Sequence, residues 1–310
     1  MVKGMTGGEL NWIDRIRKRV TLPAGGEIAL GIGDDCAIFH ARGSNEDLLF
    51  TTDLLVEDVH FRRETHSPAD VGWKALARGL SDLAAMGGEP RFCLLSLALP
   101  PWADRRWVDG FYRGLLRLSA KAGAPLIGGD LGSAAKLVCD IVACGAAPKG
   151  RALRRDGARP GDLIYVSGSL GGSALGLAGG SRKALRKHLR PEPRLELGKY
   201  LRETLGATAA MDISDGLSMD LRRMCLASNL SAEIEAPPIF PGATLEEALH
   251  GGEDYELLFT ARPGLSTPTK VGAVTLTQIG KMRPGKPGAV KLRGKPLPPL
   301  GYDHLRGRLE

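Results

Sequence analysis

The sequence has few aromatic residues, which make up 5% of its 310 positions, whereas 43% of the positions are hydrophobic. Proteins that bind nucleic acid usually combine a concentrated basic stripe with aromatic side chains on which bases stack. The net charge of +7 is instead spread over several arginine and lysine runs, including residues 151–159 and 182–194. We interpret these runs as solvated faces, of which one or two arginines could meet nucleotide phosphates. We expect no nucleic-acid partner.

Long apolar runs are also missing. No stretch of about 18 uninterrupted apolar residues occurs, and the first ten residues lack the order of a signal peptide. The five cysteines are odd in number and irregularly spaced, so they offer neither a disulfide framework nor a CxxC metal pair. These absences predict no membrane partner and a cytoplasmic protein with reduced, mostly buried thiols.

Two common nucleotide-binding motifs are absent. The P-loop pattern Gly-x-x-x-x-Gly-Lys-Ser/Thr does not occur. Gly31-Ile32-Gly33 lacks the third glycine of a dinucleotide fingerprint, and the two aspartates that follow it would repel a pyrophosphate unless a metal intervened. A P-loop fold and a Rossmann dehydrogenase are therefore disfavoured. The glycine-rich turn at residues 168–172 fits a tight connection and an anion-binding turn at a helix N-terminus equally well.

The length of the chain and a segment rich in glycine and proline near its middle indicate two domains. A chain of 310 residues exceeds the usual size of one hydrophobic core, and residues 148–160 form a basic segment rich in glycine and proline. We expect an N-terminal domain at 1–148 and a C-terminal domain at 149–310. Strands and helices mix in both halves, which predicts an α/β (α+β) fold with mixed sheets. The expected helices include residues 68–86, 104–122 and 215–228, and the expected strands include residues 28–31, 48–52, 92–99, 126–127, 137–143, 163–167, 209–213, 232–235, 255–260, 276–280 and 290–293.

Acidic residues recur just after short apolar strands, flanked by glycine or hydroxyl residues. Carboxylates and hydroxyls are the hard oxygen ligands that Mg²⁺ prefers, commonly together with substrate phosphates. Any one of these segments could be an ordinary turn, but four of them, in both halves, favour a magnesium site. The segments are Gly33-Asp34-Asp35, Thr51-Thr52-Asp53, Gly128-Gly129-Asp130 and Asp212-Ile213-Ser214-Asp215.

Asp82 is expected near the C-terminal end of the helix at residues 68–86, where the helix dipole disfavours a negative charge. A cation should therefore compensate it. One candidate is a magnesium ion shared with Asp35 and Asp53, and the other is Arg78, four residues earlier on the same helix.

A second group of residues suits an organic substrate: His60, Glu253 and Tyr302. A lone histidine after a strand is more often structural than functional. Gly251-Gly252-Glu253-Asp254 is less ordinary, because two glycines and two acids before a strand weaken it without helping a sheet. We therefore interpret this segment as functional.

Taken together, these segments closely resemble the thiamine-monophosphate kinase family. The resemblance covers nearly the whole chain, and the motifs stand in the family's order. The last motif, together with Gly301-Tyr302-Asp303-His304, helps to separate this family from its superfamily relatives. The motifs are Gly31-Ile32-Gly33-Asp34-Asp35-Cys36-Ala37, Thr51-Thr52-Asp53, Ser81-Asp82-Leu83-Ala84-Ala85-Met86-Gly87, Gly128-Gly129-Asp130, Met211-Asp212-Ile213-Ser214-Asp215-Gly216-Leu217 and Gly251-Gly252-Glu253-Asp254-Tyr255-Glu256-Leu257.

The resemblance implies the two-domain fold of aminoimidazole ribonucleotide synthetase, a homodimer formed through the N-terminal domains, and ATP bound close to that interface. It also implies the transfer of phosphate from ATP to thiamine monophosphate, giving ADP and thiamine diphosphate. Because both substrates are anionic, several Mg²⁺ ions would be needed, and direct in-line transfer requires no protein nucleophile. Two stretches depart from the family pattern: residues 179–186 are short and basic, and residues 263–271 are too short for the helix expected there.

The resemblance also assigns roles by position. The implied magnesium shell is Asp35, Thr51, Thr52, Asp53, Asp82, Asp130, Asp212 and Asp215. The implied ATP contacts are Tyr112, Gly129, Asp130, Arg155 and Ser214, with Arg155 offsetting triphosphate charge. The implied contacts to thiamine monophosphate are His60, Glu253 and Tyr302.

Other functions of the same superfamily remain open, among them selenophosphate synthetase, a carbamoyl-dehydrating maturation enzyme and aminoimidazole ribonucleotide synthetase. A selenophosphate synthetase would carry a reactive cysteine near the N-terminus, whereas the first cysteine here is Cys36, inside an acidic motif. A non-catalytic sensor of nucleotide and metal is a further alternative. It is disfavoured because every implied ligand is present.

Overall fold

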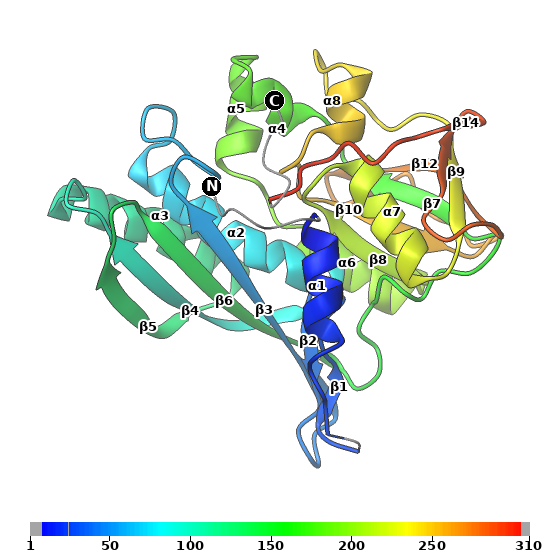
Figure 1. Cartoon of the computed structure of the whole chain (residues 1–310), viewed down its shortest axis with the longest axis horizontal. Helices are drawn as coiled ribbons and strands as arrows, with labels where there is room; N and C mark the ends of the chain where they lie inside the picture. The colour runs from blue at the N-terminus through cyan, green and yellow to red at the C-terminus, as the bar shows by residue number, and fades with distance from the viewer. Residues whose placement is uncertain (1–7, 24, 305–310) are drawn as a thin grey trace.

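The structure is a computed structural model and describes residues 8–23 and 25–304. It contains two sheets that lie on either side of one central helix (Figure 1). No helix within these described residues is long and apolar enough to cross a membrane.

The N-terminal sheet has six strands, which follow the N-terminal helix α1 (Glu9–Arg17). Only β4 and β5 run parallel, and every other neighbouring pair is antiparallel. Helices α2 (Pro68–Ala85) and α3 (Arg105–Ala122) cover one face of this sheet (Figure 1). The order across the sheet is β1 (Ile28–Leu30), β2 (Ala37–Phe39), β3 (Glu46–Val56), β6 (Val138–Pro148), β4 (Glu89–Leu99) and β5 (Leu126–Ser133).

The C-terminal sheet is also mixed, because β13 and β9 run parallel while the other pairs are antiparallel. The order across it is β14 (Lys295–Pro296), β13 (Val290–Leu292), β9 (Ser231–Ile234), β12 (Val274–Arg283), β7 (Leu163–Ser167), β10 (Glu256–Ala261) and β8 (Ala209–Ile213), with β11 (Lys270–Val271) on β12. Its helices are α4 (Gly172–Leu177), α5 (Arg182–Leu189), α6 (Leu195–Tyr200) with the π-helical turn η1 (Leu201–Leu205), α7 (Leu217–Ala227) and α8 (Leu245–His250). The expected two-domain α/β fold with mixed sheets is confirmed.

The long expected helices correspond to α2, α3 and α7, with ends that differ by one or two residues. The strand expected at 126–127 continues to Ser133, and α1, β2 and α8 were not predicted. Helix α8 has a detectable start, since Thr244 and Glu247 form a reciprocal capping box. Residues 263–271 contain no helix and end in the short strand β11, in agreement with the short length of that segment.

Helix α2 lies at the centre of the molecule. Its start is fixed by a capping box between Ser67 and Asp70, with Pro68 in the first turn. It contacts β3 and β6 of its own domain, and also α6, β8 and β10 of the C-terminal domain. Ala84 and Ala85, at its end, belong to the same buried cluster as residues of the C-terminal sheet. The helix is therefore part of both domain cores.

Glycines permit the close crossing of α2 and α3. A Cβ on Gly114 would lie 1.9 Å from the carbonyl oxygen of Ala69, and one on Gly72 would lie 2.0 Å from that of Phe111. We expect Gly114→Ala to destabilise the protein by about 2 kcal/mol or more, because the clash with rigid backbone outweighs alanine's helix propensity. Urea unfolding checks this, with Gly132→Ala as the control, since a Cβ there meets nothing within 4 Å. Equal unfolding midpoints for the two variants would contradict the prediction.

Candidate active site

Three aspartates from both domains form a compact acidic cluster. Asp35 lies between β1 and β2, Asp82 lies on α2 and Asp212 lies on β8, and one carboxylate oxygen of each lies within 4.8 Å of the others. Burial, and then the charges of neighbouring aspartates, raise the pKa values of Asp82 and Asp212 well above the usual range. The Oδ2 atom of Asp35 is buried and has no hydrogen-bond partner among the described residues. These donors fit a divalent cation.

Neighbouring groups orient this acidic cluster. The hydroxyl of Thr51 donates a hydrogen bond to Asp82 (2.5 Å), and the hydroxyl of Ser81 donates one to Asp212 (2.6 Å). Arg78 is paired with Asp53 at 2.8 Å and also donates to the carbonyl oxygen of Leu54. Arg78 is therefore paired with Asp53 and, among the described residues, forms no ion pair that would compensate Asp82, although, against the effect of burial, the charge of Asp82 contributes to raising the pKa of Arg78. A bound metal remains the candidate for that role.

Arg155 lies at the edge of the cluster, on the segment that joins the two domains. Its Nε atom is 3.1 Å from Asp34, and its Nη2 atom is 2.5 Å from Asp35. Burial and the charge of Asp35 raise the pKa of Asp34 to about 6, although Arg155 opposes this shift. Arg155, implied as a nucleotide contact, neutralises this acidic pair in the structure.

The loop after β8 connects the acidic cluster to two of the three residues that the resemblance implies as substrate contacts. We call these three residues, His60, Glu253 and Tyr302, the substrate-side residues. The carbonyl oxygen of Ser214 accepts a hydrogen bond from the backbone of Glu253 (2.7 Å), and that of Asp215 accepts one from the backbone of Tyr302 (3.0 Å). The carboxylate of Asp215 is paired with Arg223 at 2.5 Å. Ser214 and Asp215 thus hold the backbones of Glu253 and Tyr302 next to the end of β8, which carries Asp212.

Other implied residues lie apart from the acidic cluster. Thr52 and Asp130 belong to the outer face of the N-terminal sheet, the face away from α2 and α3. The hydroxyl of Thr52 donates to Asp140 on β6 (2.6 Å), and Asp130 and Asp140 both lie opposite Ser96 of β4. Sequence reasoning did not single out Asp140, and its only signal is its cross-strand position.

Gly129 and Tyr112 also have structural roles. A Cβ on Gly129 would lie 1.8 Å from the carbonyl oxygen of Leu95, so the approach of β5 to β4 requires glycine there. Tyr112 lies on α3 and packs against the N-terminal core, with its ring edge-on to that of Phe111. Neither residue belongs to the acidic cluster.

The segment that links α8 to β10 is strained. Glu253 and Tyr255 adopt positive φ angles of 63° and 50°, which are unfavourable for residues with a side chain. A Cβ on Gly252 would lie 2.7 Å from the carbonyl oxygen of Ser214, so the loop also packs closely. Strain of this kind is common at functional sites, which agrees with the functional interpretation of this segment.

The three acids of this segment have different partners. Asp254 accepts hydrogen bonds from the backbone of Gly171 (2.6 Å) and Ser173 (3.1 Å) at the start of α4. The glycine-rich turn at 168–172 therefore holds a carboxylate of the chain itself. Glu256 is paired with Arg194 at 2.6 Å. Only Glu253 faces the substrate-side residues.

Lys74, which sequence reasoning missed, connects two of the substrate-side residues. Its side chain is fully buried, and its Nζ atom lies 2.9 Å from the Glu253 carboxylate and donates to the carbonyl oxygen of His60 (3.0 Å). Burial lowers the pKa of Lys74. Burial raises the pKa of Glu253, but the charge and hydrogen bond of Lys74, together with the charges of His188 and Arg78, outweigh that effect and lower the pKa to about 2. The signal was available, since Lys74 and Arg78 lie four residues apart within the largely apolar stretch at residues 71–80 of α2.

His60, His304 and Tyr302 form a row of rings. The ring centroids of His60 and His304 are 5.1 Å apart, and those of Tyr302 and His304 are 4.7 Å apart. Burial lowers the pKa of His60 to about 3, so its ring is neutral, and its buried Nε2 atom has no hydrogen-bond partner among the described residues. The three rings offer flat aromatic surfaces, and the Glu253 carboxylate adds one negative charge.

Comparison with known proteins identifies the family. Models described as AIR synthase related protein match residues 33–147 with the N-terminal domain and residues 159–292 with the C-terminal domain. Thiamine-monophosphate kinases of Escherichia coli K12 and Bacillus subtilis are 39% and 35% identical, over 97% and 90% of this chain and 99% and 94% of theirs. The chain belongs to the thiamine-monophosphate kinase family.

Solved structures of this kinase family have the same fold. AaThiL complexed with AMPPCP and TMP matches with a TM-score of 0.87 and 33% identity, over 98% of this chain and 100% of that one. Thiamine-monophosphate kinase from Stenotrophomonas maltophilia matches with a TM-score of 0.74 and 38% identity, over 93% and 98%. Both domains of this chain therefore correspond to those of the kinase.

Proposed function

We infer that this protein transfers a phosphoryl group from ATP to thiamine monophosphate, giving ADP and thiamine diphosphate. The observation that carries this inference is that both domains match the thiamine-monophosphate kinase family. The acidic cluster, to which both domains contribute aspartates, supports it. The AaThiL structure, which contains AMPPCP and TMP, supports the same pair of substrates.

Several Mg²⁺ ions would be held by the buried aspartates and their neighbours, and they would supply the charge neutralisation that brings two anionic substrates together. Asp35, Asp82 and Asp212 form the centre of this proposed shell. Thr51 and Ser81 orient two of these carboxylates. The full proposed shell is Asp35, Thr51, Thr52, Asp53, Asp82, Asp130, Asp212 and Asp215, of which Thr52 and Asp130 lie on the outer face of the N-terminal sheet, apart from the acidic cluster.

The nucleotide is proposed to contact Tyr112, Gly129, Asp130, Arg155 and Ser214. Of these residues, Arg155 has the clearest electrostatic role. Its guanidinium group bridges Asp34 and Asp35. Once a metal ion neutralises these two acids, the guanidinium group would be available to pair with the triphosphate. Transfer is proposed to be direct, without a phosphorylated protein. A phospho-protein trapped with labelled ATP alone would refute that step.

Thiamine monophosphate is proposed to bind beside His60, Glu253 and Tyr302. Its thiazolium ring is cationic and planar, and this site offers aromatic rings and a carboxylate that is ionised at neutral pH. Lys74 would hold Glu253 and the backbone of His60 in place.

A homodimer through the outer face of the N-terminal sheet is part of the same proposal. Leu54 on that face and Leu131 on the edge strand β5 are 52% and 64% exposed, which favours a covered surface. A partner there would bring Thr52 and Asp130 into an interface. We also propose domains at 1–148 and 149–310, and a cytoplasmic location, which the free, buried cysteines support.

A coupled assay of ADP release tests the function. We expect turnover that requires thiamine monophosphate, ATP and Mg²⁺ together. No rate above the ATP-only background would contradict the assignment. Nucleotide binding without turnover would then favour a sensor, whereas turnover with selenide or another acceptor would favour a selenophosphate synthetase or an enzyme like aminoimidazole ribonucleotide synthetase.

A further inference from the structure

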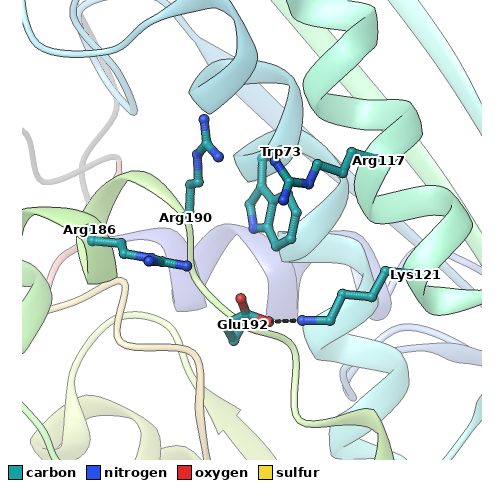
Figure 2. A pocket seen from close by; sticks show the side chains of 6 residues that line it. All are labelled: Trp73, Arg117, Lys121, Arg186, Arg190 and Glu192. Atoms are coloured by element: carbon teal, nitrogen blue, oxygen red, sulfur yellow. Dashed lines mark hydrogen bonds and ion pairs between the residues drawn. The ribbon is translucent and has the colours of Figure 1, made fainter. Parts of the chain in front are cut away.

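A basic groove lies beside α2, between α3 and α5. One hollow of about 360 Å³ is lined by Trp73, Arg117, Lys121, Arg186, Arg190 and Glu192. Figure 2 shows Arg186 and Arg190 on one side of it, Arg117 and Lys121 on the other, and Trp73 between them. An adjoining hollow of about 460 Å³ shares Arg117, Arg186 and Arg190 and adds Asp70 and Arg182 among its lining residues. We call the two hollows together the basic groove.

The positive charges of the basic groove are only partly balanced. Its lining includes five cationic side chains and two carboxylates. Lys121 is paired with Glu192 and Arg190 with Asp70, both at 2.5 Å. In the part of the chain that the structure describes, no ion pair involves the other three cations, which are Arg117, Arg182 and Arg186. Arg117, Arg182 and Arg186 therefore line the hollow of about 460 Å³ without an ion-pair partner of their own among the described residues, while Asp70, the carboxylate in its lining, is paired with Arg190.

The floor of the groove is fixed. The indole Nε1 of Trp73 donates a hydrogen bond to the carbonyl oxygen of Pro191 (2.8 Å), which ties the segment after α5 to α2. The cations themselves come from α3, from α5 and from the segment after α5. A concave surface with cations from separate elements can surround a compact anion, and guanidinium groups bind phosphate oxygens in pairs.

We propose that the basic groove binds a small polyphosphate anion, of the class of inorganic pyrophosphate or a nucleoside diphosphate. The volume suits a small molecule. A nucleic-acid strand fits less well, because stacking needs exposed rings and Trp73, the only aromatic residue that lines the described groove, is 6% exposed.

An anion bound in the basic groove would contact both α3 and α5 and so hold these helices together. Helix α5 also contacts Glu253, one of the substrate-side residues. His188 on this helix lies with its Nδ1 atom 3.4 Å from the Glu253 carboxylate. Occupancy would thus hold His188 against Glu253. This effect on catalysis rests on the proposed function, whereas binding of the anion does not.

Titration calorimetry with inorganic pyrophosphate, on the full chain in EDTA at fixed ionic strength, tests the proposal. EDTA removes metal-dependent binding at the acidic cluster. We expect one site in the parent protein, and a dissociation constant raised at least tenfold in the double variant Arg117→Gln/Arg186→Gln, since two of the guanidinium groups proposed to bind the anion are lost.

The matched control is Arg105→Gln/Lys183→Gln, which removes two charges from the same helices, α3 and α5, outside the groove. We expect this control to bind like the parent protein. No binding by the parent, or equal weakening in both double variants, would overturn the proposal, because the second result means diffuse attraction. Urea midpoints check that both variants fold. The ADP-release assay, run separately, shows whether the proposed function fails independently of the groove.

Discussion

Asp82→Asn is expected to lower the rate of ADP formation by about a hundredfold or more, since one ligand of a charge-neutralising metal accounts for several kcal/mol of barrier. The stability of the metal-free protein should stay the same or rise. Burial raises the pKa of Asp82, and the charges of the neighbouring carboxylates raise it further. An amide keeps the shape and removes the charge. Initial rates and melting temperatures in EDTA and in Mg²⁺ check both effects.

The melting temperatures show whether Asp82 is a metal ligand or only a buried carboxyl group. Mg²⁺ should raise the melting temperature of the parent protein, and it should raise that of Asp82→Asn much less. The control is Asp109→Asn, a substitution of the same chemistry at a carboxylate on α3 that is 62% exposed. A variant that loses activity but keeps the full Mg²⁺ stabilisation would place the metal elsewhere.

Lys74→Met is expected to raise the Michaelis constant for thiamine monophosphate by about tenfold or more, because a buried partner of Glu253 worth several kcal/mol is removed. Lys74 contacts both Glu253 and the backbone of His60, so its loss frees two substrate-side residues at once. The Michaelis constant for ATP should change little, since Lys74 has no contact with the acidic cluster. Steady-state kinetics with each substrate varied in turn measure this difference.

Two comparisons distinguish a specific effect of Lys74 on substrate binding from a general loss of structure. Lys136→Met removes an exposed lysine that is paired with Asp58 at 2.8 Å, and it should leave both constants unchanged. Lys74→Met should also be less stable by about 3 kcal/mol, because Glu253 keeps its charge without its partner. Equal increases in the two Michaelis constants would show that the variant disturbs the whole site, and would contradict a specific positioning role.

Part of the acidic cluster could be predicted, because aspartates beside glycine or hydroxyl residues recur in both halves of the sequence, although Asp82 lies on helix α2 and Asp212 lies within β8. The residues beside them could not be placed as well. Thr51, Thr52 and Asp53 were grouped together, but successive side chains of a strand point to opposite faces. Thr52 therefore lies on the outer face with Asp140, while Thr51 and Asp53 face α2.

Contacts between distant parts of the chain account for most of what sequence reasoning missed. Lys74 and Glu253 are 179 positions apart, and nothing local indicates that they meet. Arg78 was weighed against its neighbour on the helix, Asp82, but it pairs with Asp53 on another element. One consequence is practical: Asp53→Ala is a poor test of catalysis, because it leaves a buried guanidinium group unpaired.

Helix α2 also restricts how the molecule can move. Its end is packed into the C-terminal core through Ala84 and Ala85, and a Cβ on Gly198 of α6 would lie 2.0 Å from the carbonyl oxygen of Ala84. A hinge between the two domains would have to pull this helix out of one core, at the cost of buried apolar contacts. We therefore expect the two domains to move little relative to each other, and the spacing between Asp82 of the N-terminal domain and Asp212 of the C-terminal domain to be fixed when the chain folds.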